Sequence, residues 1–140
     1  MAALSRLLRI SFGQCDPAGI VYYPNYFDMF NTSTEWMVCD ALAVHPRDLM
    51  NRYGIFGLPI VDARNTYHRP SRNGDQVRID SRVTEIGRSS FRVEHRLFIE
   101  NGDLGVEGFE VRVWAGIDPA NPAAIKGIPI PVAVRKHLLP

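Results

Sequence analysis

The sequence has 140 residues, 46% hydrophobic and 22% charged, which suits a single globular domain over residues 1–140 with its own core. A formal net charge of +1 creates no strong field, so neither nucleic acid nor a membrane surface is expected as a partner. No apolar run is long enough to span a membrane, and the N-terminus lacks the pattern of a signal peptide. Two cysteines, Cys15 and Cys39, make no disulfide framework, which favours a cytoplasmic location.

The first predicted elements are a strand over residues 5–12 and a long helix that opens at Pro24, a residue suited to the first turn of a helix. Residues 26–43 contain no glycine or proline. Apolar and small side chains recur there on two adjacent helical rows: Tyr26, Phe30, Ser33, Met37 and Ala41, and Phe27, Thr34, Val38 and Leu42. This spacing predicts one helix with a wide apolar face.

The remainder of the chain is predicted to form four strands. The first covers 55–66, and strict alternation predicts half-buried strands at 77–84, 91–99 and 109–117. The residues expected to face inward are Val77, Ile79, Ser81 and Val83, then Phe91, Val93, His95, Leu97 and Ile99, then Phe109, Val111, Val113, Ala115 and Ile117.

Turn residues and a change of parity refine this layout. Leu104 and Val106 fall on the opposite parity from Phe109, so a β-bulge is predicted near Gly108. The turn Asn101-Gly102-Asp103 predicts a hairpin. A proline-rich loop is expected over 118–131, followed by a short helix over 132–139. A strand, one long helix and four further strands together predict an α+β fold, in which an antiparallel sheet wraps a central helix.

Several common chemistries lack their sequence patterns. The four histidines are far apart and no pair has the spacing of metal ligands. No G-x-S-x-G, G-x-G-x-x-G or P-loop pattern occurs. We therefore expect no metal and no cofactor. Cys39 is expected in the core, and Cys15 and Asp16 are adjacent in the chain, so they would point apart rather than act together.

The segment from Phe12 to Tyr26, F-G-Q-C-D-P-A-G-I-V-Y-Y-P-N-Y, combines an acid, turn residues and aromatic residues. On its own, Asp16-Pro17 is explained by an aspartate that closes a turn. However, Pro17 removes a backbone donor that could bind the carboxylate, and Tyr22, Tyr23 and Tyr26 surround it with apolar surface. The helix that starts after Tyr23 offers unpaired amides. A carboxylate opposite free amides is suited to acyl transfer.

The run G-Q-C-D-P-A-G-I-V-Y-Y-P-N-Y-F resembles the signature D-x-D-P-x-G-I-V-x-x-x-N-Y of hotdog-fold acyl-CoA thioesterases of the 4-hydroxybenzoyl-CoA thioesterase type. A looser resemblance continues at 54–61 (G-I-F-G-L-P-I-V) and 85–91 (E-I-G-R-S-S-F). The resemblance implies a five-stranded antiparallel sheet wrapped around one long helix, and hydrolysis of an acyl-CoA substrate. It also implies a homodimer or homotetramer with sites at subunit interfaces.

The resemblance also implies residue roles. Asp16 corresponds to the nucleophile or general base, and the backbone amide of Tyr23 to the group that polarises the thioester carbonyl. The turn Arg88, Ser89, Ser90 corresponds to the segment that contacts the CoA nucleotide and phosphates. Asn31 stands where the hydroxybenzoyl enzyme has an aspartate near the acyl ring, and Gln14 replaces the first acid of the signature.

The acyl group and two other classes of function are left open. Tyr22, Tyr26 and further aromatic residues of the helix favour an aromatic acyl group, and a short or medium acyl chain is the alternative. A hotdog dehydratase or hydratase would need a helix histidine, or a paired Asp and His as acid and base, and residues 16–44 contain no histidine. A non-catalytic module that binds acyl-CoA remains the third reading.

Overall fold

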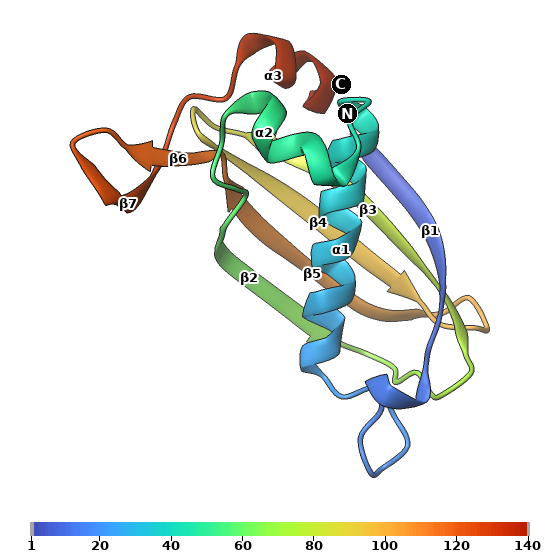
Figure 1. Ribbon diagram of the computed structural model, residues 1–140. Coiled ribbons are helices and arrows are strands. Elements are labelled where there is room, and N and C mark those ends of the chain that lie inside the picture. The colour runs from blue at the N-terminus through green and yellow to red at the C-terminus, as the bar shows by residue number, and fades with distance from the viewer. Residues whose placement is uncertain (1, 140) are drawn as a thin grey trace.

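A computed structural model describes residues 2–139 of the protein (Figure 1). The helices and strands are, in chain order, β1 (Ala3–Arg9), the 3-10 turn η1 (Phe12–Gln14), α1 (Pro24–Ala41), the 3-10 turn η2 (Pro46–Asp48), α2 (Leu49–Tyr53), β2 (Ile60–Tyr67), β3 (Gln76–Ile86), β4 (Ser90–Phe98), β5 (Leu104–Val113), β6 (Ala115–Asp118), β7 (Asn121–Gly127) and α3 (Val132–Leu138). None of the helices within this range is long and apolar enough to cross a membrane.

The main sheet has five strands in the order β1-β3-β4-β5-β2, and every neighbouring pair is antiparallel. It curls around α1, which crosses one face of the sheet (Figure 1). The α+β class and the hotdog arrangement are therefore confirmed. β1 and β2 are the two edge strands, and the connection between them contains α1 and α2.

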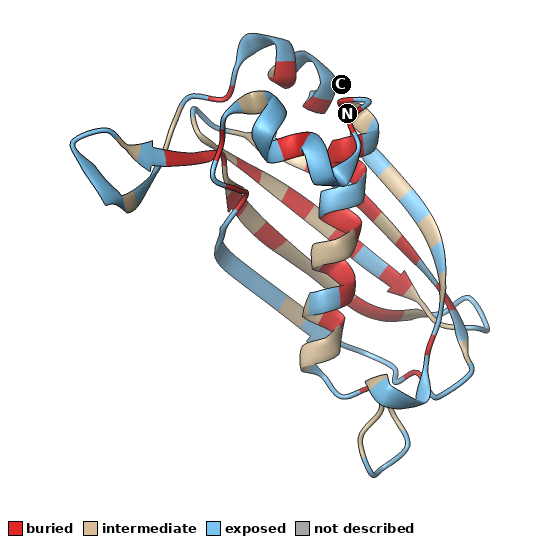
Figure 2. Ribbon diagram, in the orientation of Figure 1, coloured by how far each residue is buried: buried red, intermediate tan, exposed pale blue. Residues whose placement is uncertain are grey.

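The apolar face of α1 supplies much of the core. Figure 2 shows that the buried residues of α1 lie on the side facing the sheet. Eight helix residues are buried: Tyr26, Met29, Phe30, Ser33, Thr34, Met37, Val38 and Cys39. On the β1 side, Arg6 donates from Nε to Ser33 Oγ at 2.7 Å and from Nη2 to the Met29 carbonyl at 2.8 Å. These bonds fix how α1 is rotated about its axis.

The predicted inner faces of β3 and β4 are confirmed. Seven of the residues expected to face inward are buried there: Val77, Ile79, Ser81, Val83, Phe91, Val93 and Leu97. His95 is also buried, at 1% exposed. The hairpin at Asn101-Gly102-Asp103 joins β4 to β5 as predicted, and Gly102 takes a φ of 93° that suits glycine.

The predicted inner face of β5 is wrong. Glu110 and Arg112 are buried, whereas Phe109, Val111 and Val113 are only partly buried on the outer face. No bulge occurs at Gly108, because the pairing with β4 runs continuously through it; the irregularity lies at Leu97/Phe98 instead. The physical reason is that a charged pair is buried inside the sheet. The apolar alternation therefore marks the outer face of this strand.

Other boundaries differ from the predictions. The first strand spans Ala3–Arg9 rather than 5–12, and β2 begins at Ile60 rather than at 55. The expected loop over 118–131 contains most of a two-stranded hairpin, β6–β7, that projects from the body of the fold (Figure 1). Pro122 is tolerated there because a two-stranded hairpin consists only of edge strands. The short helix near the end, α3, is confirmed.

Candidate active site

Asp16 lies in a tight turn between β1 and α1. Its amide donates to the Ile20 carbonyl at 2.9 Å, and its carbonyl accepts from the Gly19 amide at 2.9 Å. Gly19 has a φ of 83°, a left-handed conformation that favours glycine. The Asp16 carboxylate accepts at Oδ1 from the Ala18 amide at 2.9 Å. Within residues 2–139, Oδ2 has no hydrogen-bond partner and remains available for chemistry.

The Ala18 bond corrects one expectation from the sequence. Pro17 was expected to leave the carboxylate without a backbone donor, but the turn uses the amide one residue further along, which Pro17 leaves intact. The apolar surroundings are also only partial. Asp16 is half-buried, and Tyr22 and Tyr23 are 50% and 59% exposed. Tyr26 is buried as expected, and burial raises the pKa of its phenol, which therefore stays neutral.

The start of α1 supplies an unpaired amide close in sequence to Asp16. The Gln14 carbonyl accepts from the Tyr22 amide and from Asn25 Nδ2, each at 2.8 Å, and so ties the loop to the helix start. The Tyr23 amide has no partner in the described chain. Because it lies at the positive end of α1, it is suited to hold a developing negative charge. Asn25 was not predicted as a site residue, although its place in the signature could have indicated this bond.

An apolar hollow of about 290 Å³ adjoins this helix start. Its lining includes Tyr23, Tyr26 and Tyr67 together with Ile20, Val21 and Pro70. The rings of Tyr23 and Tyr67 meet edge to face, with centroids 6.5 Å apart. Asp16 and Tyr22 thus lie in the loop before α1. Tyr23 and Tyr26 lie at the start of the helix and line a hollow with aromatic walls.

The surface around this hollow continues along the flank of α1 that faces β5 and β2. Tyr23, Phe27 and Asn31 recur at every fourth residue, so they follow one side of the helix. Across from them, the register pairs Ala63 with Glu110 and Tyr67 with Val106, which places both β2 residues on the inner face of the sheet. Ala63 is exposed and Tyr67 is 46% exposed, so α1 leaves the inner face of β2 partly uncovered.

Asn31 sits above a buried polar cluster that sequence reasoning missed. Arg112 donates from Nη2 to Asn31 Oδ1 at 2.6 Å, from Nη1 to the Leu58 carbonyl at 2.8 Å, and from Nε to Glu110 Oε1 at 3.0 Å. Glu110 also accepts from the Thr34 hydroxyl. The pattern E-x-R in a predicted strand could have indicated this cluster, since residues two positions apart lie on the same face of a strand.

His95 completes this cluster. Its Nδ1 lies 2.7 Å from Ser81 Oγ, and its Nε2 lies 3.6 Å from Glu110 Oε1. Phe30 stacks on the imidazole, with centroids 4.6 Å apart. Burial alone would raise the pKa of the Glu110 carboxyl. The interactions with His95 and the charge of Arg112 outweigh burial and hold that pKa below its ordinary value. Glu110 is therefore ionised at neutral pH and balances the charge of Arg112.

The turn Arg88, Ser89, Ser90 lies far from Asp16 in the same chain. Asp16 follows the end of β1, where Arg9 pairs with Gln76 at the start of β3. Arg88 follows the other end of β3, a strand of 11 residues, which spans about 33 Å. There the Arg88 and Ser89 carbonyls accept from Ile130 and Trp114. A single chain thus does not bring this turn to the candidate site.

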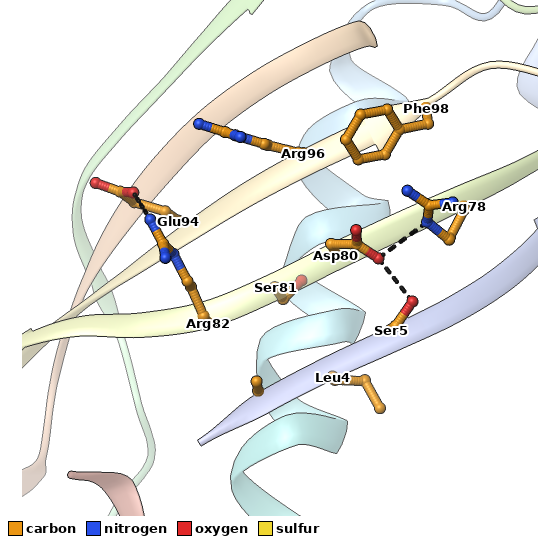
Figure 3. A pocket seen from close by; sticks show the side chains of 10 residues that line it. Leu4, Ser5, Arg78, Asp80, Ser81, Arg82, Glu94, Arg96 and Phe98 are labelled. Carbon is orange, nitrogen blue, oxygen red and sulfur yellow. Dashed lines mark hydrogen bonds and ion pairs between the residues drawn. The ribbon is translucent and has the colours of Figure 1, made fainter. Parts of the chain in front are cut away.

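A larger hollow, of about 730 Å³, lies on the outer face of β1, β3 and β4 (Figure 3). Its charged side chains largely pair with one another: Arg78 with Asp80 at 3.2 Å, and Arg82 with Glu94 at 3.6 Å. α1 covers the opposite face of the sheet. This hollow therefore contributes nothing to the site around Asp16.

Comparison with known proteins adds to this geometry. Residues 10–136 match the family model of the thioesterase-like superfamily. Over 123 residues the chain is 32% identical to 4-hydroxybenzoyl-CoA thioesterase of Pseudomonas sp. (strain CBS-3), covering 84% of this chain and 86% of that protein. Over 88 residues it is 36% identical to 1,4-dihydroxy-2-naphthoyl-CoA hydrolase of Synechococcus elongatus, covering 63% of this chain and 64% of that protein. The chain thus spans just under two thirds of the length of this second relative.

A solved structure extends the similarity to the whole fold. It is a 4-hydroxybenzoyl-CoA thioesterase with an aspartate changed to asparagine, in complex with 4-hydroxybenzoyl-CoA. The two chains share 26% of their residues and align with a TM-score of 0.88 over 99% of this chain and 100% of that one. With a family model that matches most of its length, the chain belongs to the thioesterase-like superfamily and has its hotdog fold.

Proposed function

We propose that the protein hydrolyses the CoA thioester of an aromatic acid to the free acid and CoA. The observations that carry this proposal are that Asp16 has a free carboxylate oxygen and that the Tyr23 amide, seven residues later at the start of α1, is unpaired in the described chain. The family membership supports it. So do the two relatives described above, whose names specify hydrolysis of aromatic acyl-CoA thioesters.

In the proposed reaction, the Tyr23 amide binds the thioester carbonyl oxygen, on which negative charge develops. Asp16 Oδ2 either attacks the carbonyl carbon itself or removes a proton from an attacking water. The tetrahedral intermediate collapses with loss of the CoA thiolate, a good leaving group. In the first route, water then cleaves the resulting anhydride. The Ala18 amide holds Oδ1 and so orients Oδ2 during either route.

The hollow beside Tyr23 supports an aromatic acyl group. Tyr23, Tyr26 and Tyr67 give it aromatic walls against which a ring can pack. Tyr22 is half-exposed and packs edge to face on the ring of Tyr23. Asn31 lies further along the same flank of α1 as Tyr23. A short or medium acyl chain would fill such a hollow with less complementary contact, so it is the second candidate.

We further propose that the working protein is a homodimer or homotetramer. β2 is an edge strand with a partly uncovered inner face, and its outer edge offers backbone donors and acceptors that a second copy can pair. Edge-to-edge pairing would also explain why Arg88, Ser89 and Ser90 lie so far from Asp16 within one chain. In an assembly, this turn of the partner subunit would contact the CoA bound near Asp16.

The test is thiol release from benzoyl-, 4-hydroxybenzoyl-, phenylacetyl-, butyryl- and octanoyl-CoA. We expect selective turnover of an aromatic thioester. In Asp16→Asn, kcat should fall at least about a hundredfold with the fold intact, on the scale of losing a general base. Asp48→Asn, a change at an exposed carboxylate with 61% side-chain exposure, is the matched control and should retain wild-type turnover.

Two outcomes would contradict this proposal. Turnover by Asp16→Asn at the wild-type rate would show that Asp16 only closes a turn and takes no part in catalysis. Thioesters that raise the melting temperature and stay intact would instead identify a non-catalytic acyl-CoA-binding module.

A further inference from the structure

The hollow beside the start of α1 combines aromatic walls with positive charge. Its walls are formed in part by Tyr23, Tyr26 and Tyr67. It is also lined by His68 and Arg69, whereas none of the described residues that line it is acidic. Its volume of about 290 Å³ is at the lower end of the range of roughly 300–1,000 Å³ for small-molecule sites. The hollow therefore suits a compact ring that carries negative charge.

Arg69 is the cation in this lining whose hydrogen-bond donors are available. His68 Nε2 lies within hydrogen-bond distance of Glu107 Oε1, at 3.1 Å. Arg69 Nε lies 3.4 Å from Asp103 Oδ2, and within residues 2–139 this ion pair makes no hydrogen bond. The same carboxylate oxygen already accepts from Asn101 Nδ2 at 3.1 Å. Because the side chains of Arg69 and Asp103 are 61% and 52% exposed, their attraction is weak and leaves the guanidinium able to bind a second anion.

The backbone holds Arg69 beside the aromatic walls. Its amide donates to the Gly105 carbonyl at 3.0 Å. Two residues earlier, the ring of Tyr67 packs against the rings of Tyr23 and Tyr26, with centroids 6.5 and 5.7 Å apart. Two residues of extended chain span about 7 Å. Arg69 thus lies within reach of a substituent on a ring that packs against these tyrosines.

From these contacts we infer that Arg69 is a specificity-determining residue. Its guanidinium binds an anionic substituent of the acyl group, such as a second carboxylate, and favours such thioesters over neutral ones of the same shape. This inference rests on the proposed function and names the acyl class within it: an aromatic acid that carries a second acidic group on its ring.

The test compares kcat/KM for carboxybenzoyl-CoA and carbamoylbenzoyl-CoA, each with the substituent at ring position 3 or 4. The carboxylate and the carboxamide have nearly the same shape, and only the carboxylate is charged. Because the carboxylate-to-carboxamide ratio is compared between variants, the intrinsic reactivity of the thioesters cancels. For at least one ring position, this ratio should fall about tenfold in Arg69→Gln and further in Arg69→Glu. Arg69→Lys should restore part of the preference.

Two further measurements separate recognition of charge from a merely structural role. Asp103→Asn should raise the ratio, because Arg69 then loses its competing carboxylate. Added salt should lower the wild-type ratio, because charges on partly exposed groups are screened. Loss of stability alone would lower both rates and leave the ratio unchanged. Arg72→Gln is the matched control, since Arg72 is exposed on the same loop and does not line the hollow, and it should keep the wild-type ratio.

Failure of the inference differs from failure of the proposed function. A ratio that stays at the wild-type value in Arg69→Gln and Arg69→Glu at both ring positions, while benzoyl-CoA is still hydrolysed, overturns the inference alone. An equal fall in Arg72→Gln also overturns it, because the general charge of the loop would then explain the preference. No hydrolysis of any thioester by the wild type overturns the proposed function and the inference with it.

Discussion

At the scale of single residues, the sequence predicts that the candidate site is built from short-range parts. Asp16 and Tyr23 are seven positions apart in one loop, so the distance between them depends only on a turn and a helix start. The hydrogen-bond partner of the Asp16 carboxylate could not be predicted from the sequence, because the bond from the Ala18 amide depends on the exact backbone conformation. That conformation requires a residue that tolerates a φ of 83° at position 19.

Gly19→Ala tests this requirement. A side chain at this φ is strained whatever space surrounds it, and we expect a loss of about 1–2 kcal/mol in the free energy of unfolding. Thiol release should fall too, because the turn that orients Asp16 is distorted. Gly13→Ala is the control, since Gly13 has an ordinary φ and open space around it. Urea denaturation compares the two variants, and equal stability of both would contradict the expected strain.

At the scale of elements, α1, β3 and β4 were predictable because each buries an apolar face with a regular period. β5 was not, because Glu110 and Arg112 occupy its inner face. Burying one charge is unfavourable, and burial of the two becomes possible only when α1 and β4 supply the remaining partners. Those partners are distant in the sequence. The alternation of β5 therefore pointed to the wrong face.

The charge of Glu110 should make stability depend on pH. Because the folded-state pKa of Glu110 is lowered from 4.5, its stabilisation is fully present above that value and is lost as pH falls through the folded-state pKa. At pH 7, Glu110→Gln should cost about 3–5 kcal/mol, since Arg112 is left buried without its partner. Near pH 3 the difference between wild type and variant should be smaller, because the wild-type carboxyl is then closer to protonation.

Urea unfolding at a series of pH values measures this difference. The exposed change Glu85→Gln is the control, and its small effect should vary little with pH. A difference between wild type and Glu110→Gln that stays constant from pH 7 to pH 3 would show that folding does not lower the pKa of Glu110.

At the scale of the whole molecule, the free edge of β2 is the dominant feature. Val61, in this strand, is 64% exposed. A charge introduced there should meet the same charge from the second copy in an edge-to-edge pair, and like charges facing across strands are destabilising. We therefore expect Val61→Glu to lower the mass measured by light scattering towards that of one chain. Val132→Glu, at a residue of α3 that is 70% exposed, should leave the mass unchanged.

The separation of Asp16 from the Arg88 turn, by the length of β3, has a genetic consequence. If a site takes Asp16 from one subunit and Arg88 from the other, the lesions Asp16→Asn and Arg88→Glu should complement each other in mixed dimers. One site of such a dimer would carry both lesions and the other would carry neither. With random assortment of the two chains, about a quarter of all sites would be intact. Co-expressed chains should then turn over dilute thioester faster than either variant alone, whereas sites confined to one chain would give only the average of the two.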